Sequence, residues 1–204
     1  MQLVGMLDSP YVRRVAISLR LLGLPFEHRS ISVFRQFDEF RAVNPVVKAP
    51  SLVCDDGEVL LDSTLILQHA EALAAPRRTL MPGTVAERQH ALRVIGLALA
   101  ACEKTVQIVY EHTQRPPEKR HAPWLERVRG QLAAACAELE RALAQRALPD
   151  DEAGLTQAGV TAAVAWSFIQ DDRPGEVDPA AHPHLAGYAQ RAERLPCFAA
   201  FPPH

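Results

Sequence analysis

An excess of positive charge is what the 204-residue sequence most clearly lacks, because its formal net charge is −2 at pH 7. Proteins that are drawn to nucleic acid or to anionic lipid carry a surplus of Lys and Arg. We therefore expect no nucleic-acid partner and no membrane partner. Small molecules or other proteins are the partners that this charge balance favours.

Cysteine and long apolar runs are scarce as well. The four cysteines lie far apart, with no CxxC pair and no Cys/His cluster at metal-ligand spacing: Cys54, Cys102, Cys136 and Cys197. This pattern predicts reduced thiols and no metal. No apolar stretch approaches the roughly 18 residues that span a bilayer, and no basic region of a signal peptide opens the sequence. We expect a cytoplasmic protein.

What the sequence does contain is a hydrophobic fraction of 48%, enough for one or two globular domains. An apolar run, a helical periodicity and a loosely alternating run follow one another over residues 2–6, 10–22 and 26–33, which predicts a β-α-β opening. The runs "SLVC" and "EVLL", separated by Asp-Asp-Gly, predict an antiparallel hairpin. A helix is expected next, over residues 63–73, with Ser63 able to cap it.

The second half of the sequence is typical of helices. After an irregular linker at residues 77–83, two amphipathic stripes begin at Leu92 and Leu125, and "VTAAVAWSFI" is apolar on all sides. A final helix is expected over residues 183–195. The pattern predicts a first domain over residues 1–77 and an all-helical domain over residues 85–204.

The segment "NPVVKAPSLVCDDGEVLLDSTLIL", residues 44–67, resembles the glutathione S-transferase family, and "SPYVRRV" strengthens the resemblance. It implies a thioredoxin-like α/β domain that binds glutathione, followed by an all-α C-terminal domain. Two positions depart from the family pattern. Val47 replaces a frequent glycine, and Gly159 replaces the acid that often follows Thr156 by three residues, which costs a helix cap about 1 kcal/mol.

The pair Ala49-Pro50 has two interpretations. An X–Pro bond is cis in only about 5% of folded cases, so the residues alone favour an ordinary trans proline. The resemblance implies a cis Pro50 instead, with the Ala49 backbone free to bind the cysteinyl part of glutathione as an added strand would. It also implies that Lys48, otherwise a solvated loop lysine, contacts the glycine end of glutathione. Arg35 is a weaker candidate for that contact.

The pair Asp62-Ser63 precedes the expected helix at residue 63, and the residues alone predict no more than an N-cap. The resemblance implies that the N–H and hydroxyl of Ser63 bind the γ-glutamyl α-carboxylate of glutathione, as a helix N-terminus can. It implies that Asp62 pairs with the ammonium group beside that carboxylate.

Ser9, in "MLDSPYVRRV", is predicted from the residues alone to cap a helix, with Arg13 and Arg14 in solvent. The resemblance implies that its hydroxyl stabilises the thiolate of glutathione. Lowering that thiol pKa by two units from about 8.5 takes about 2.7 kcal/mol. A hydrogen bond to a charged group contributes about 1.5–3 kcal/mol and a helix N-terminus adds to it. Tyr11 is a rival donor.

The resemblance implies a glutathione S-transferase with glutathione as co-substrate, a small hydrophobic electrophile as second substrate, no metal and a homodimer. Tyr11, Tyr110 and Trp166 are candidates to line the electrophile pocket, although Trp166 equally fits a core position. Two alternatives stay open. One is a non-catalytic binding module, and the other is a glutathione-dependent isomerase, dehalogenase or peroxidase. A thiol-disulfide transferase is disfavoured because no cysteine stands at position 9.

Overall fold

The computed structural model describes residues 1–203, and the chain divides into two compact units. The first unit comprises Met1–Leu80 and the chain from Arg194 on, and the second comprises Met81–Glu193. The boundary at residues 80 and 81 lies inside the linker that the sequence predicts at residues 77–83.

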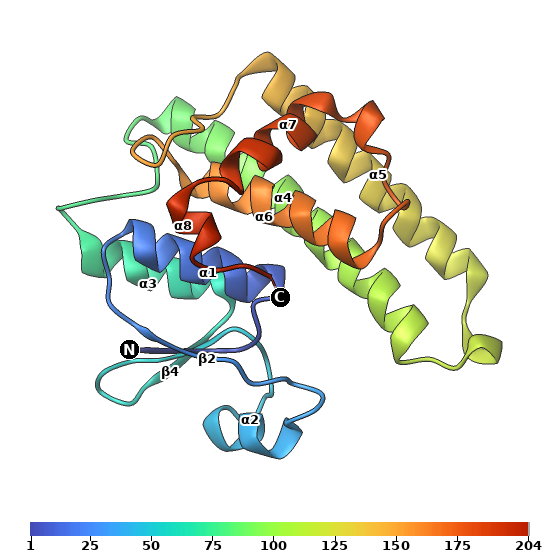
Figure 1. Ribbon diagram of the computed structural model, residues 1–204, viewed down its shortest axis with the longest axis horizontal. Helices are drawn as coiled ribbons and strands as arrows, with labels where there is room; N and C mark the ends of the chain where they lie inside the picture. The colour runs from blue at the N-terminus through green and yellow to red at the C-terminus, as the bar shows by residue number, and fades with distance from the viewer. Residues whose placement is uncertain (204) are drawn as a thin grey trace. The chain divides into compact units, whose positions relative to one another are not determined.

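A four-stranded sheet forms the centre of the first unit. Its strands are β1 (Gln2–Val4), β2 (Glu27–Arg29), β3 (Ser51–Val53) and β4 (Val59–Leu61), in the order β2-β1-β3-β4, and its helices are α1 (Pro10–Leu21), α2 (Phe37–Val43), α3 (Ser63–Ala74) and α8 (Pro196–Ala199). β1 and β2 are parallel and β3 and β4 are antiparallel, as predicted. Helices α1 and α3 cover one face of the sheet and α2 lies on the other (Figure 1). The predicted thioredoxin-like α/β arrangement is confirmed.

Strand β1 has buried side chains on both faces of the sheet, so each face is covered by other elements. Leu3 and Val4 are both fully buried, and successive residues of a strand point to opposite faces. Val4 packs in one cluster with Ile31 and with Phe40 of α2. Leu3 therefore faces the opposite layer, under α1 and α3.

Two local features of this unit differ from the sequence prediction. The strand expected over residues 26–33 ends at Arg29, because the Ser32 hydroxyl accepts the N–H groups of Phe34 at 3.3 Å and Arg35 at 3.1 Å and turns the chain. The short helix α2 follows, and no helical pattern in the sequence predicts it.

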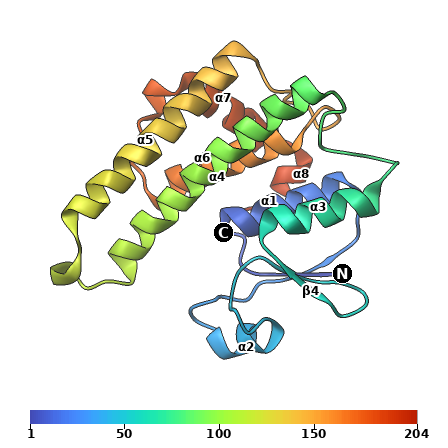
Figure 2. The ribbon, with the colours of Figure 1, turned by 180° about the vertical axis from the view of Figure 1, so that it is seen from behind.

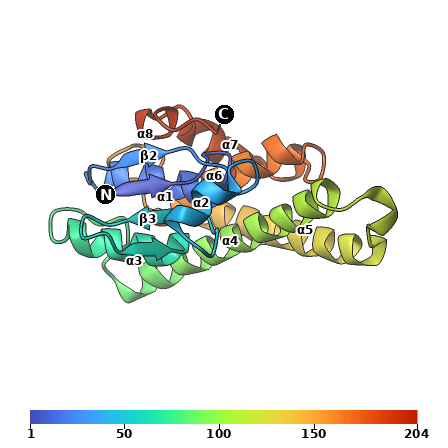
Figure 3. The same ribbon diagram turned by 90° about the horizontal axis from the view of Figure 1, so that it is seen from below.

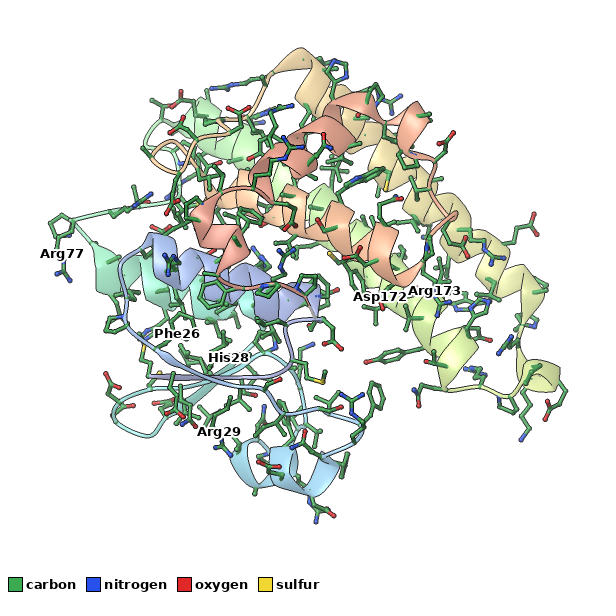
Figure 4. All side chains as sticks on the ribbon, in the orientation of Figure 1. Phe26, His28, Arg29, Arg77, Asp172 and Arg173 are labelled. Carbon is green, nitrogen blue, oxygen red and sulfur yellow. The ribbon has the colours of Figure 1, made fainter. Side chains whose placement is uncertain are left out.

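The chain from Arg194 on also differs from the prediction, which assigns it to a helical domain over residues 85–204. In the structure α8 packs against α1 of the first unit. The Arg13 Nε donates to the Phe201 carbonyl at 2.8 Å. The ring of Phe26, which is labelled in Figure 4, stacks on that of Phe201 with centroids 5.8 Å apart. These contacts hold the segment on the helix that begins after Ser9.

The second unit is all-helical, as predicted. Its elements are α4 (Val85–Thr113), α5 (Ala122–Gln145), α6 (Gln157–Asp172), α7 (Pro183–Ala192) and the short 3₁₀ helices Pro117–Lys119 and Pro179–Ala181. The long helices α4 and α5 run antiparallel, side by side (Figure 2, Figure 3). Residues 157–166 of α6 are buried without interruption, which confirms the predicted central helix. Over residues 1–203, none of the helices combines the length and apolarity that crossing a membrane requires.

Two predicted helix features of this unit are wrong in detail. Leu92 is 54% exposed, because the buried stripe of α4 begins one residue earlier, at Ala91. The last helix stops at Ala192 rather than Leu195, and Pro196 starts the separate helix α8.

Gly159 is a packing requirement rather than a missing cap. The Thr156 hydroxyl still accepts the Gly159 N–H, at 3.3 Å. A Cβ on Gly159 would lie 2.2 Å from the Tyr188 hydroxyl oxygen, and that hydroxyl donates to the Pro149 carbonyl at 3.1 Å. The tyrosine therefore occupies the space that a side chain at position 159 would need.

Candidate active site

Ser9 occupies the N-cap position of α1, with an extended backbone at φ −72° and ψ 121°. Its carbonyl accepts the Arg13 N–H at 3.0 Å, but its hydroxyl makes no capping hydrogen bond. The predicted cap therefore holds for the backbone and not for the side chain. The hydroxyl, on a half-buried residue, has no hydrogen-bond partner within residues 1–203. The Ser9 hydroxyl is thus a polar group at a helix N-terminus that stabilises no part of residues 1–203 through a hydrogen bond.

Ala49 lies beside the chain that leads from β1 into α1. A Cβ built on Gly5 would be 3.1 Å from the Ala49 Cβ and 2.6 Å from a methyl carbon of Val12. Only glycine fits between these two side chains. The φ of Gly5, 138°, is also a conformation that favours glycine. The Ala49–Pro50 peptide bond is cis, as the resemblance implies. Within residues 1–203 neither backbone group of Ala49 has a hydrogen-bond partner.

The loop before Pro50 is held by buried side chains. The Asn44 amide donates to the Ser51 hydroxyl at 2.9 Å, and that hydroxyl donates to the Lys48 carbonyl at 2.9 Å. The Lys48 side chain itself is exposed. The network therefore fixes the backbone beside Ala49 and leaves the lysine ammonium group in solvent.

Val47, which stands where the family pattern frequently has glycine, has a positive φ. Its φ of 52° lies in the left-handed region, which a β-branched side chain seldom adopts. Its side chain packs against the cluster formed by Val4, Ile31 and Phe40. Apolar contact thus offsets part of the backbone cost.

Helix α3 begins differently from the prediction, because Asp62 and not Ser63 is its N-cap. One carboxylate oxygen of Asp62 accepts the N–H groups of Thr64 at 2.8 Å and Leu65 at 3.4 Å. The Ser63 N–H has no acceptor in the described part of the chain. Asp62 has a φ of 71° and a ψ of 121°, a backbone conformation at positive φ that glycine adopts more readily than any residue with a side chain. The helix therefore offers the Ser63 N–H, and the second oxygen of Asp62, to a ligand.

Arg14 joins the first turns of α1 and α3. Its Nη1 donates to the Ser63 hydroxyl at 3.0 Å and to the Thr64 hydroxyl at 3.3 Å. Arg14 and Arg13 are each only 2% exposed, so the prediction that both are solvated is wrong. The physical reason is that α1 is buried on almost every side. The run of apolar residues on both sides of the arginine pair is the signal that sequence reasoning missed.

The remaining predicted residues fall in both units. Tyr11 is half-buried in the first turn of α1, and the exposed Arg35 contacts the Met6 sulfur at 3.3 Å. In the second unit, Tyr110 is 45% exposed, whereas Trp166 is 5% exposed with its ring 5.7 Å from that of His182. Trp166 thus lies in the core, which is the second of the two positions that the sequence allows for it. Its part in an electrophile pocket, with Tyr11 and Tyr110, stays a prediction.

The four cysteines are free thiols. Burial raises the pKa of the Cys136 thiol to about 12. Burial, and then the charges of Asp56, Glu58 and Asp55, also raise the pKa of Cys54, whose sulfur is 3.9 Å from the His69 ring. These two thiols are therefore protonated at neutral pH and are poor nucleophiles. Within residues 1–203 no group of three or more His, Cys, Asp or Glu side chains is placed to hold a metal ion.

Comparison with known proteins identifies the family. Residues 3–78 match the family model described as glutathione S-transferase, N-terminal domain. A glutathione S-transferase from Methylobacterium radiotolerans, solved in complex with glutathione sulfonate, is 32% identical, with a TM-score of 0.89 over 100% of this chain and 94% of that one. This chain belongs to the glutathione S-transferase family.

Two further relatives of this glutathione S-transferase family member come from bacteria. A family member from Pseudomonas fluorescens Pf-5, solved with bound glutathione, is 28% identical with a TM-score of 0.85, covering 100% of this chain and 98% of that one. The uncharacterized GST-like protein YibF of Escherichia coli K12 is 27% identical over 86% of each chain. The segment matched by the family model contains Ser9, Lys48, Ala49, Pro50, Asp62 and Ser63.

Proposed function

We propose that this protein is a glutathione transferase in which the first unit binds glutathione and the Ser9 hydroxyl donates a hydrogen bond to its thiolate. The observation that carries the proposal is the Ser9 hydroxyl, which stands at the N-terminus of α1 without a capping bond. The side-chain oxygen of an N-cap serine usually accepts a backbone N–H of its own helix. The Ser9 hydroxyl makes no such bond, so it is available to donate to another acceptor.

Glutathione lies along three parts of the first unit in this proposal. The backbone of Ala49 pairs with the cysteinyl residue as a strand would. The γ-glutamyl α-carboxylate binds the N–H and hydroxyl of Ser63, and its ammonium pairs with the second oxygen of Asp62. Lys48 reaches the glycine carboxylate. The packing of Gly5 between Ala49 and Val12 of α1, and the hydrogen bond from Arg14 to Ser63, support this placement, because they link both subsites to α1.

The chemistry follows from the thiol pKa. Glutathione loses its thiol proton to solvent, and the remaining thiolate accepts a hydrogen bond from Ser9. The sulfur then attacks an electrophilic carbon, a C–S bond forms, and the leaving group departs with its electron pair, for example as halide from an aryl halide. Ser9 neither gains nor loses a proton in this scheme. The second substrate is a small hydrophobic electrophile, and the acting species is a homodimer.

Glutathione binding and aryl halide conjugation test the proposal together. Wild type should be retained on immobilised glutathione and should conjugate 1-chloro-2,4-dinitrobenzene, whereas Ser63→Ala should bind glutathione more weakly. Ser30→Ala is the matched control, because Ser30 is an exposed serine of the same unit outside the site. Wild type that neither binds glutathione nor turns over would refute the proposal. Binding with turnover of hydroperoxides alone would replace conjugation by peroxidase chemistry.

A further inference from the structure

The first turn of α3 contains a serine whose hydroxyl is already held by a buried cation. Arg14, which is 2% exposed, donates from Nη1 to the Ser63 oxygen at 3.0 Å. Ser63 is itself buried, at 4%. A guanidinium group has donors only and stays protonated in proteins. The direction of this hydrogen bond is therefore fixed, and the Ser63 oxygen is its acceptor.

A hydroxyl group has one donor and two acceptor positions. Arg14 fills one acceptor position of Ser63, so the hydroxyl hydrogen is left for a different partner. In the described part of the chain nothing accepts that hydrogen. The adjacent Ser63 N–H also lacks an acceptor there. Ser63 thus presents two donors and is held by a permanent positive charge, which together favour a carboxylate over a neutral group or an amine.

We infer that Arg14 is a positioning residue that orients the Ser63 hydroxyl and makes this end of the site selective for a ligand carboxylate. The inference rests on the proposed function, and it assigns to Arg14 the preference for the γ-glutamyl α-carboxylate of glutathione. Arg14 does not touch the ligand. It acts through the Ser63 oxygen, and the Thr64 hydroxyl at 3.3 Å helps to hold its guanidinium group in place.

Arg13 provides the matched control. It is the next residue in α1 and is equally buried, at 2%. Its Nε donates to the Phe201 carbonyl at 2.8 Å, and its guanidinium lies 5.7 Å from the centre of the Phe198 ring. Loss of Arg13 therefore removes a buried arginine of the same helix without touching Ser63.

Calorimetric titration with two ligands tests the inference. One ligand is glutathione, and the other is its analogue without the γ-glutamyl α-carboxylate. Arg14→Gln should weaken glutathione binding about 10- to 100-fold, the effect of one hydrogen bond to a charged group. It should leave the Kd of the analogue unchanged within about twofold. Ser63→Ala should give the same pattern, and the double variant should lose little more, because the two residues act as one unit.

Two additions keep the test decisive. If Arg14→Gln does not fold, Arg14→Lys, which keeps the charge with one donor group, carries the test and should show a smaller loss for glutathione alone. The pKa of the bound thiol, measured from thiolate absorbance near 240 nm, should not change in either variant. Arg13→Gln should affect both ligands alike.

Equal loss of both ligands in the Arg14 variants, or no loss of either, would overturn the inference and give Arg14 a structural role only. Wild type that fails to bind glutathione would instead refute the proposed function, so the two failures are distinguishable. Wild type that binds both ligands equally would show that the carboxylate is not recognised at Ser63, and would overturn the inference while leaving transferase activity standing.

Discussion

Replacement of Ser9 by alanine removes a hydroxyl group from the N-terminus of α1 and leaves the helix backbone intact. A hydrogen bond from a hydroxyl to a charged sulfur contributes about 1.5–3 kcal/mol, which raises the pKa of the bound thiol by about 1–2 units when it is lost. If wild type holds this pKa two units below about 8.5, most bound glutathione is thiolate at pH 7. The variant, with a pKa 1–2 units higher, should hold only about 3–24% as thiolate at that pH.

The conjugation rate should fall accordingly. At pH 7 and saturating glutathione we expect a decrease of roughly 3- to 25-fold for Ser9→Ala, with recovery toward the wild-type rate above about pH 9, where the thiol ionises unaided. Thiolate absorbance near 240 nm, titrated against pH in both proteins, measures the pKa directly. Ser9→Thr keeps the hydroxyl and should retain most of the activity.

Ser9→Ala should also have an unusually small effect on the free energy of unfolding. An N-cap serine replaced by alanine ordinarily costs about 1 kcal/mol, but the Ser9 hydroxyl makes no capping bond. Ser9→Ala should therefore change the free energy of unfolding by less than about 0.5 kcal/mol. Thr84→Ala is the comparison, because the Thr84 hydroxyl accepts the Glu87 N–H at 3.3 Å and its loss should cost about 1 kcal/mol in urea denaturation.

An unchanged thiol pKa in Ser9→Ala would refute the catalytic role of Ser9. Tyr11→Phe is then the informative variant, since its phenol is the rival donor. A large loss of stability in Ser9→Ala would contradict the view that its side chain has no structural task.

Further predictions concern packing, pH and thiol reactivity. Gly159→Ala should destabilise the protein by about 1–3 kcal/mol in urea denaturation, because its Cβ would overlap the Tyr188 hydroxyl, and Tyr188→Phe in the same chain should recover part of the loss. Burial raises the pKa of Glu140, but hydrogen bonds from two backbone N–H groups at the start of α7 outweigh it and lower the pKa overall. Its contribution to stability is therefore complete above about pH 4.3, the ordinary glutamate pKa, and is lost as the pH falls below it; Glu140→Gln should flatten the acid side of the stability profile. Native protein should react slowly with a thiol reagent at pH 8, Cys54 first and Cys136 only on unfolding, as a labelling time course with peptide mapping would detect.

Features of the fold that depend on periodicity could be predicted from the sequence. The β-α-β opening, the hairpin and the buried helix α6 all follow from patterns of apolar residues. Helix α2 could not be predicted, because its seven residues are too few to establish a period. The sequence wrongly predicts Leu92 on the buried face of α4. That face contains several alanines, whose hydrophobic periodicity is weaker than that of leucines.

Site residues divide in a similar way. The positions of Ser9, Asp62 and Ser63 at helix N-termini follow from local sequence, and the cis Ala49–Pro50 bond follows only from the family resemblance. Arg14 could not be found by either route. Its role depends on α3 and on the packing around α1, and a basic residue in a helix is ordinarily read as solvated. Which of Asp62 and Ser63 caps α3 depends on backbone angles that the sequence does not specify.

The packing of α8 on α1 has a consequence for synthesis on the ribosome. The first unit is not continuous in sequence, because Phe198 and Phe201, which contact Arg13 and Phe26, follow all of the second unit. At about 5–20 residues per second, they are translated on the order of 10 s after Leu80. The helix that carries Ser9 is thus fully covered only after the second unit has been made, so the unit that starts first is the one completed last.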